Sequence, residues 1–242
     1  MHCDGRSLSP NPYMAEWQTV KRKKRGRGAP AQGCCAHAAD DREDPVAPAS
    51  WDADQAARVA ALEQSAWCGR ALDALVRAAP APDRVVCFGL GSIFESRNSQ
   101  WQLAFLELAA RACGVAAEAY DPILCAAERD ALRRLGVGAG APLGAGAPPP
   151  PPRALYFMPH CPMALYAEVL RRHAPRLDGL VIVGNSFASY AARKIGDDMD
   201  ADIAAALARV VEVAADPGRD SDLERPFNDM AIMSFPAPAA PT

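Results

Sequence analysis

The chain has 242 residues, of which half are apolar and 23% are charged, and this is enough for one sizeable globular domain with flexible segments. Its formal net charge is −3, and residues 51–242 carry 18 Lys and Arg against 23 Asp and Glu. Nucleic-acid backbones need clustered positive charge, so this mildly acidic part is not expected to bind them. No apolar run approaches the ~18–20 residues of a transmembrane helix, and we expect no membrane association.

The first residues, MHCDGRSLSPNPYMAEW, lack the basic-then-apolar order of a secretory signal. We therefore expect a cytoplasmic or nuclear protein whose eight cysteines are reduced thiols. The cysteines form no C-x-x-C pair, so no metal site is expected.

Composition divides the chain into three regions. Residues 1–49 are rich in Pro, Gly, Ala and charge without periodicity, and we expect them to be disordered, as we do the tail 237–242. The basic run from Lys21 to Arg27 is either a nuclear-import signal, a nucleic-acid arm or a solvated tail. Residues 50–236 are predicted to form one α/β domain with a Gly- and Pro-rich low-complexity insert near 138–153.

Within this domain the apolar pattern alternates between helix and strand. In chain order it predicts a helix over 51–78, a strand over 84–89, a helix over 98–113 closed by Gly114, a strand over 116–120, a helix over 123–135, a weak edge strand near Val137, a strand over 154–158, a helix opening at Pro162, a strand over 180–184, a helix over 200–213 and a last strand over 230–235. Short apolar strands alternating with helices indicate a Rossmann-like three-layer sandwich, with a mostly parallel sheet and helices on both faces.

Small and polar residues gather where the predicted strands end, and in such sheets ligands bind outside the carboxyl ends of the strands. The segment PFND instead precedes the last strand, so it reaches the same edge only if that strand runs antiparallel. The sequence therefore predicts a small-ligand crevice at this edge. Its candidate residues are Gly89, Gly91, Ser92, Glu95, Ser96, Asp121, His160, Asn185, Ser186, Ser189, Asn228 and Asp229.

The glycine turn after the first strand permits several interpretations. Gly89 and Gly91 allow tight turning and close backbone approach, and the amides that follow can receive an anion. The dinucleotide fingerprint G-x-G-x-x-G has Phe94 where its third glycine should stand. A phosphate or nucleotide site, a structural turn and a site for another ligand all stay open. Asp121 either accepts hydrogen bonds from a ribose or caps the helix that follows.

No residue can be assigned a catalytic role from the sequence. The segment GNSFA around Ser186 nearly forms the G-x-S-x-G elbow of α/β-hydrolases, in which the histidine follows the serine. The four histidines all precede Ser186, so a hydrolase triad is disfavoured. His160 is either a hydrogen-bonding loop residue or a catalytic acid or base, and Cys87 is expected to be a small buried hydrophobe.

Taken together, these segments resemble the SRR-like family, named for "sensitivity to red light reduced". The chain departs from the family pattern after FND, where members often carry a threonine and then a histidine and this chain has Met230 and Met233. The resemblance covers about residues 80–236 and rests on FGLGSIFESRNSQWQLAFL, YDP, LYFMPHCP, VGNSFASY and FND, together with W-x-x-V at Trp17 and Val20.

The resemblance implies a regulatory protein, because members act in light signalling, in circadian rhythm and in the regulation of haem biosynthesis. It implies no established reaction and identifies no cofactor, and both a small ligand and protein partners are candidates. Two other functions stay open. A glycine turn followed by an acidic residue also suits a nucleotide- or S-adenosylmethionine-dependent transferase, and the chain could be a non-catalytic interaction module.

Overall fold

The structure is a computed structural model that describes residues 45–79, 81–144, 147, 149–193, 201–218 and 222–237. The basic run from Lys21 to Arg27 lies outside the described residues, as do nearly all of the two ends for which disorder was expected.

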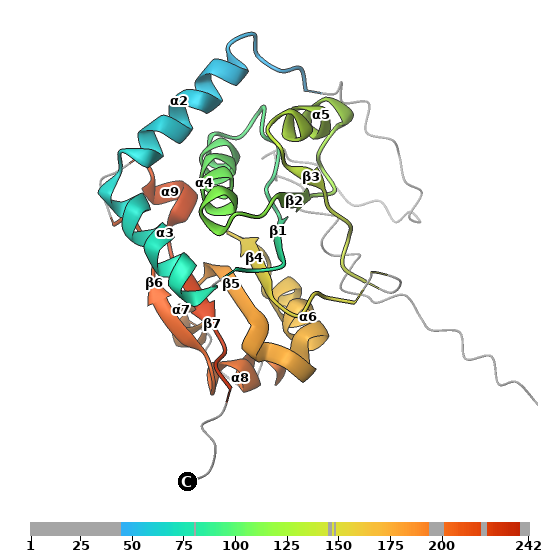
Figure 1. The fold of residues 1–242 in the computed structure, drawn as a ribbon, viewed down its shortest axis with the longest axis vertical. Helices are drawn as coiled ribbons and strands as arrows, with labels where there is room; N and C mark the ends of the chain where they lie inside the picture. The colour runs from blue at the N-terminus through green and yellow to red at the C-terminus, as the bar shows by residue number, and fades with distance from the viewer. Residues whose placement is uncertain are drawn as a thin grey trace, which may run out of the picture. The chain divides into compact units, whose positions relative to one another are not determined.

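The described residues form one seven-stranded sheet in the order β3-β2-β1-β4-β5-β7-β6 (Figure 1). Strands β1 to β5 run parallel to one another, whereas β7 runs antiparallel to both β5 and β6. The expected mostly parallel α/β fold is therefore confirmed, and the last strand has the antiparallel direction that PFND required. The strands are β1 (Arg84–Phe88), β2 (Ala117–Tyr120), β3 (Gly138–Ala139), β4 (Ala154–Met158), β5 (Leu180–Asn185), β6 (Val211–Ala214) and β7 (Met230–Ser234).

Helices cover both faces of this sheet. The strand order reverses between β1 and β4, so right-handed crossovers place the helix after β1 and the helix after β4 on opposite faces. Helices α2, α3 and α9 pack with α4, while α8 packs with α6 and α7. The helices are α2 (Trp51–Glu63), α3 (Ala66–Ala78), α4 (Arg97–Cys113), α5 (Ala126–Arg134), α6 (Met163–His173), the 3₁₀ helix η1 (Ala174–Gly179), α7 (Phe187–Arg193), α8 (Ala201–Leu207) and α9 (Glu224–Phe227).

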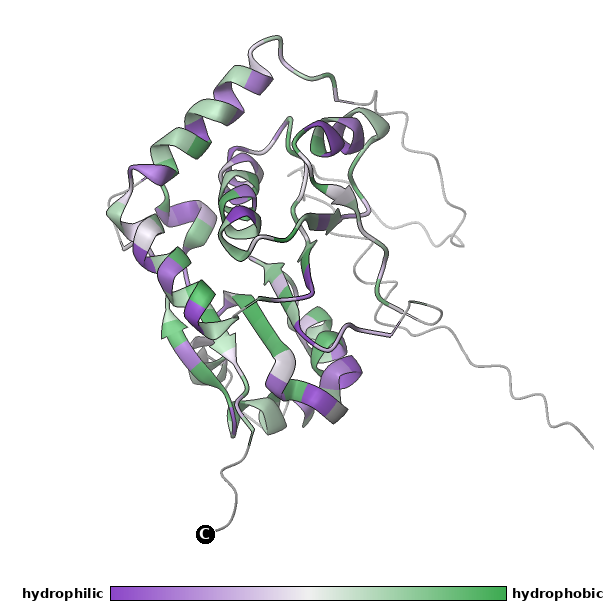
Figure 2. Cartoon of the chain, in the orientation of Figure 1, coloured by the Kyte–Doolittle hydropathy of each residue, from purple (hydrophilic) through white to green (hydrophobic). Residues whose placement is uncertain are grey.

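The central strands are buried on both faces, as expected for a parallel sheet between two helical layers. Every residue of β4 is buried, and so are the first five residues of β5. Figure 2 shows these strands as hydrophobic, while the helices around them alternate apolar and polar surfaces. The ring of Phe105 on α4 packs on Phe157 of β4 and on Phe227 of α9, with centroids 5.7 and 5.6 Å apart. This aromatic cluster joins α4 and α9 to the sheet.

Two predicted helices were wrong. The helix expected over 51–78 is interrupted because Ser65 adopts extended backbone, and its hydroxyl accepts the N–H of Cys68 as the cap of α3. Serine favours such caps over helix interiors, since its side chain competes for backbone hydrogen bonds. The helix expected over 200–213 ends at Leu207, and Val211 to Ala214 pair with β7 instead. β-branched valines alternating with Glu212 suit a strand.

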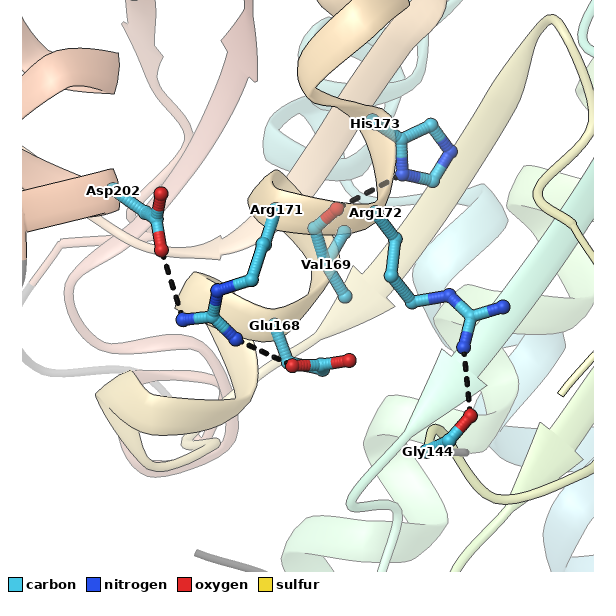
Figure 3. Close-up of polar contacts among 7 residues, drawn as sticks. All are labelled: Gly144, Glu168, Val169, Arg171, Arg172, His173 and Asp202. Atoms are coloured by element: carbon cyan, nitrogen blue, oxygen red, sulfur yellow. Dashed lines mark hydrogen bonds and ion pairs between the residues drawn. The ribbon is translucent and has the colours of Figure 1, made fainter. Parts of the chain in front are cut away.

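Side chains at the C-terminal end of α6 bind both the low-complexity insert and α8 (Figure 3). Arg172 donates hydrogen bonds to the carbonyl oxygens of Gly144 and Ala147, each over 3.1 Å. Arg171 forms ion pairs with Glu168 at 2.5 Å and with Asp202 at 2.8 Å. These side chains therefore tie the Gly- and Pro-rich segment and α8 to the same helix.

Candidate functional site at the carboxyl edge of the sheet

The glycine turn after β1 is held by a carboxylate at the end of β2. The N–H of Gly91 donates to Asp121 Oδ2 over 2.8 Å, and the N–H of Ile123 donates to Oδ1 over 3.0 Å. Burial raises the pKa of Asp121, and these two hydrogen bonds partly offset that effect. Both carboxylate oxygens thus serve backbone amides, and the N-cap of α5 is Cys125 rather than Asp121.

A second carboxylate, that of Glu128, holds the next part of the same loop and was not predicted from the sequence. Glu128 is fully buried, and its Oε1 accepts the Ser92 hydroxyl at 2.6 Å and the Phe94 N–H at 3.2 Å. Its Oε2 accepts the N–H of Cys125 at 3.0 Å, which completes a capping box. A glutamate three residues after a helix cap is a known sequence signal, but here cysteine stands in the place of serine or threonine.

Glycine is required at positions 89 and 91 because side chains from other parts of the chain lie very close to the backbone there. Both have positive φ, +70° and +76°, which favours glycine. A Cβ atom on Gly89 would lie 2.6 Å from Cys161 Sγ, and one on Gly91 would lie 2.8 Å from Ser99 Oγ. The Cys161 thiol donates to the carbonyl of Phe88 over 3.2 Å, and burial raises its pKa far above the ordinary value. The turn after β1 therefore packs directly against the turn after β4.

The turn after β4 is joined in the same way to the end of β5. His160 has a φ of +56°, and its N–H donates to Asn185 Oδ1 over 2.7 Å. Its ring Nε2 lies 3.2 and 3.1 Å from the carbonyl oxygens of Arg225 and Pro226, so this nitrogen carries the proton and donates to α9. The N–H of Asn185 donates to the hydroxyl of buried Tyr166, which in turn donates to Met158.

Ser186 has the geometry of a helix cap. Its hydroxyl donates to Glu212 Oε2 over 2.9 Å and accepts the N–H of Ser189 over 2.9 Å. Glu212 Oε1 accepts the next two amides of α7, those of Phe187 at 2.7 Å and Ala188 at 3.1 Å. A carboxylate at this position favours the helix N-terminus electrostatically. Ser96 likewise caps α4, because its side chain accepts the N–H of Ser99.

The turn before β7 completes this edge. The N–H of Ser186 donates to the carbonyl of Asp229 over 2.9 Å, and the N–H of Asp229 donates to Asp216 Oδ2 over 3.1 Å. Asp229 also has a left-handed backbone, with a φ of +60°. Loops from β1, β2, β4, β5 and β7 are thus connected by short contacts along one edge of the sheet.

Two open depressions lie beside these loops. The first, here called the His160 depression, has a volume of about 420 Å³ and is lined by Asn98, His160, Glu224, Arg225 and Asn228. The second, here called the Arg58 depression, has a volume of about 520 Å³ and is lined by Asp54, Ala57, Arg58, Glu95, Arg97, Gln100 and Trp101.

Three predicted site residues line these depressions: His160 and Asn228 the first, and Glu95 the second. The other predicted residues line neither of them. Asn98, Glu224 and Arg225 were not predicted. Asn98 lies inside the longest segment that carried the family resemblance, but Glu224 and Arg225 have no comparable sequence signal.

Three further features concern metal binding, membrane-spanning helices and cysteine thiols. Within the described segments, no group of three or more His, Cys, Asp or Glu could hold a metal ion. In the same part of the chain no helix is long and apolar enough to cross a membrane. The described cysteines, Cys68, Cys87, Cys113, Cys125 and Cys161, are free thiols, and Cys87 is buried in β1 as expected.

The fold and the edge contacts define a Rossmann-like α/β protein in which polar turns meet at the carboxyl ends of the strands. The chain belongs to the SRR1 family, since the model of the SRR1 domain matches residues 60–234. The resemblance inferred from the sequence motifs is therefore confirmed.

Among its relatives, the chain is 29% identical to Protein SENSITIVITY TO RED LIGHT REDUCED 1 of Arabidopsis thaliana, over 53% of this chain and 47% of that protein. It is 33% identical to an SRR1-like protein of Mus musculus, over 43% and 44% of the two chains. It is 26% identical to an SRR1-like protein of Drosophila melanogaster, over 66% and 57%. The chain spans about half the length of the curated relatives it matches.

A crystal structure described as cofactor-bound Rv0187 from MTB is 19% identical to this chain and covers 78% of it, with 90% of that protein covered. The TM-score of 0.39 is too low to extend the cofactor of that protein to this chain.

Proposed function

We propose that this chain is a regulatory protein of the SRR1 family that recognises a small polar ligand in the His160 depression. Its lining combines a histidine, a glutamate, an arginine and two asparagines, which come from α4, the β4–α6 turn, α9 and the residue that follows α9. Ligand sites typically combine a concave surface with a few such converging polar groups. The depression also lies at the carboxyl edge of the sheet, where doubly wound folds bind their ligands.

The observation that carries this proposal is the backbone of His160. Non-glycine residues are uncommon at positive φ, and such strain tends to cluster at functional sites. His160 is held at a φ of +56° by Asn185, and its ring is fixed against the carbonyls of α9. Asp229, the residue after Asn228, is likewise strained. A residue whose backbone is held by β5 and whose ring is held by α9 is preorganised to meet a ligand.

The variant His160→Asn tests the proposal. Asparagine tolerates the left-handed backbone, so the fold is expected to persist while the imidazole is lost. Mass spectrometry of small molecules that co-purify with the full chain should detect a species bound to the wild type and to Ser189→Ala, but absent from His160→Asn. Retention of the same species by His160→Asn, or no bound species in any sample, would contradict the proposal.

The biological roles extend the same proposal. The family resemblance implies light signalling, circadian rhythm or regulation of haem biosynthesis, in the cytoplasm or the nucleus. Cells that lack this chain should recover their phenotype with the wild-type sequence and fail to recover with His160→Asn. Full recovery with both His160→Asn and Asn185→Ala would instead favour a non-catalytic interaction module. Substitution of Lys21 to Arg27 by glutamine tests whether nuclear import needs the basic run.

A transferase that uses a nucleotide-type cofactor or S-adenosylmethionine is the second candidate, and the strand order favours it. The strands β3-β2-β1-β4-β5 follow the order of dinucleotide-binding folds, with the glycine turn after β1 and Asp121 after β2. The antiparallel β7 between β5 and β6 also occurs in S-adenosylmethionine-dependent methyltransferases, although a shared fold does not define a function. Asp121 already accepts two backbone amides, so a ribose would have to share it.

Thermal-shift measurements separate the two candidates. A nucleotide or S-adenosylmethionine at 100 times its Kd should stabilise the fold by about 2.7 kcal/mol, which is readily visible. The transferase candidate predicts this shift for the wild type and its loss in Asp121→Asn. Absence of a shift with these compounds counts against the transferase and leaves the His160 ligand to be identified by mass spectrometry.

A further inference from the structure

The Arg58 depression is a separate surface with an unusual set of donors. One wall comes from α2, through Asp54, Ala57 and Arg58. The other comes from the start of α4 and the residues before it, through Glu95, Arg97, Gln100 and Trp101. Its volume of about 520 Å³ lies within the range of roughly 300–1,000 Å³ that holds small ligands.

The guanidinium of Arg58 has a donor without an acceptor among the described residues. Its Nη1 atom is buried and forms no hydrogen bond there. Burial lowers the pKa of Arg58, Asp54 opposes that shift, and the nearby charge of Arg97 adds to it. Arg97 is itself neutralised by Asp222, whose carboxylate lies 2.9 Å away. Arg58 therefore has no such ion pair among the described residues, although Asp54 acts on its charge.

Trp101 lacks a partner in the same place. Its indole Nε1 is buried and has no acceptor in the described part of the chain. The buried indoles of Trp51 and Trp67, by contrast, donate to the carbonyls of Ile93 at 3.2 Å and Ala215 at 2.9 Å. Buried donors in folded proteins nearly always have an acceptor. Arg58 and Trp101 both line this depression, and each keeps a buried donor without an acceptor among the described residues.

We propose that the Arg58 depression binds a small molecule through a carboxylate that accepts hydrogen bonds from Arg58 and Trp101. A carboxylate has only acceptor oxygens, and its planar geometry matches a guanidinium. Asp54 and Glu95 line the same depression as Arg58 and Arg97, so a ligand with a single negative charge is repelled less there than a dianion such as phosphate. Because both nitrogens are buried, binding requires the Arg58 and Trp101 side chains to turn toward the depression.

This inference does not depend on the proposed function, because the His160 depression has a different lining. The test is a titration of the full chain with sodium benzoate, with sodium chloride at equal ionic strength as reference. Two-dimensional ¹H–¹⁵N NMR spectra resolve the indole N–H signals, and Trp101→Phe identifies the signal of Trp101. We expect that signal to move downfield to saturation, while the signals of Trp51 and Trp67 stay in place.

Variants of two arginines complete the test. Arg58→Gln should weaken benzoate binding by about tenfold or more, because the charge-assisted hydrogen bonds are lost. Arg70→Gln removes the same charge from an exposed site on α3 and should leave binding unchanged. Inorganic phosphate should move the Trp101 signal less than benzoate does.

Three results would overturn the inference: no benzoate-dependent shift of the Trp101 signal, equal weakening by Arg58→Gln and Arg70→Gln, or binding of phosphate at least as tight as that of benzoate. The first would mean that ordered water serves the two donors. Arg58→Lys checks the result independently of folding, because it keeps the charge and loses the planar fork, so it should bind with intermediate affinity.

Discussion

The main-chain N–H of His160 lies 2.7 Å from Oδ1 of Asn185, and this hydrogen bond ties the turn after β4 to the last residue of β5. Asn185 also uses its own N–H to bind Tyr166, whose hydroxyl reaches back to β4 at Met158. The left-handed backbone of His160 is therefore supported by side chains from two other elements.

Removal of the Asn185 side chain should destabilise this turn. We expect Asn185→Ala to lower the free energy of unfolding by about 1 kcal/mol, the typical contribution of one hydrogen bond. Urea denaturation followed by circular dichroism measures the change. Ser189→Ala, in the first turn of α7, should stay within about 0.5 kcal/mol of the wild type. Equal effects of the two variants would contradict a supporting role for Asn185.

Gly89→Ala should be strongly destabilising for two separable reasons. Alanine at a φ of +70° costs about 1–2 kcal/mol, and its Cβ would stand 2.6 Å from Cys161 Sγ. The double variant Gly89→Ala/Cys161→Ala removes the steric contact but keeps the backbone strain. Relative to Cys161→Ala alone, the cost of Gly89→Ala should therefore fall. A cost that is the same in both backgrounds would show that the contact with the thiol is unimportant.

Glu128→Gln should weaken the hydrogen bonds that hold the loop after β1, which contains Gly89 and Gly91. The amide would present a donor to positions where Glu128 accepts the Ser92 hydroxyl and two backbone amides. Loss of hydrogen bonds to a buried charged group predicts about 1.5–3 kcal/mol of destabilisation. Hydrogen exchange of the Phe94 amide should accelerate along with it. Glu118→Gln, at a half-exposed site in β2, is the matched control and should leave that amide unchanged.

His173 should make stability depend on pH. Burial lowers the pKa of its imidazole below the ordinary 6.5, against an opposing hydrogen bond to the Val169 carbonyl (Figure 3). Between the lowered pKa and 6.5, the unfolded chain binds a proton that the folded chain does not bind. The free energy of unfolding therefore falls as the pH falls through that window.

Urea midpoints measured between about pH 7.5 and pH 5 test this, since the window lies below the ordinary histidine pKa. The raised pKa values of Glu107 and Asp121 act in the opposite direction, so the informative quantity is the difference between the wild type and His173→Phe. The wild type should lose more stability than the variant as the pH falls. Parallel pH profiles would show that His173 does not contribute.

Much of the fold could be predicted because the helices and strands depend on local patterns in the sequence. The strand over 154–158 was predicted with its exact limits, since ALYFM is a short apolar run bounded by Arg153 and Pro159. Gly114 closes α4 with a left-handed backbone, as its residue type indicated. The helix end near Ser65 was missed because the apolar spacing continues across it, and only the cap geometry interrupts the helix.

The contacts at the carboxyl edge were less predictable, because they depend on tertiary register. Ser92 and Glu128 are 36 positions apart in the chain, and His160 meets the carbonyls of Arg225 and Pro226 from 65 and 66 positions away. Polar residues at strand ends correctly indicated where turns gather. They did not reveal that many of these groups bind one another, which leaves few of them to line the His160 depression.

The reversed direction of β7 has a practical consequence for handling the protein. Ser234 pairs with Val181 at the start of β5, so the chain departs from the side of the sheet opposite to His160, where Pro236 accepts a hydrogen bond from Arg209. A purification handle or a fluorescent fusion appended downstream of Phe235 would emerge remote from the proposed ligand surface. Immobilising the molecule by that end would leave the surface open to titrants.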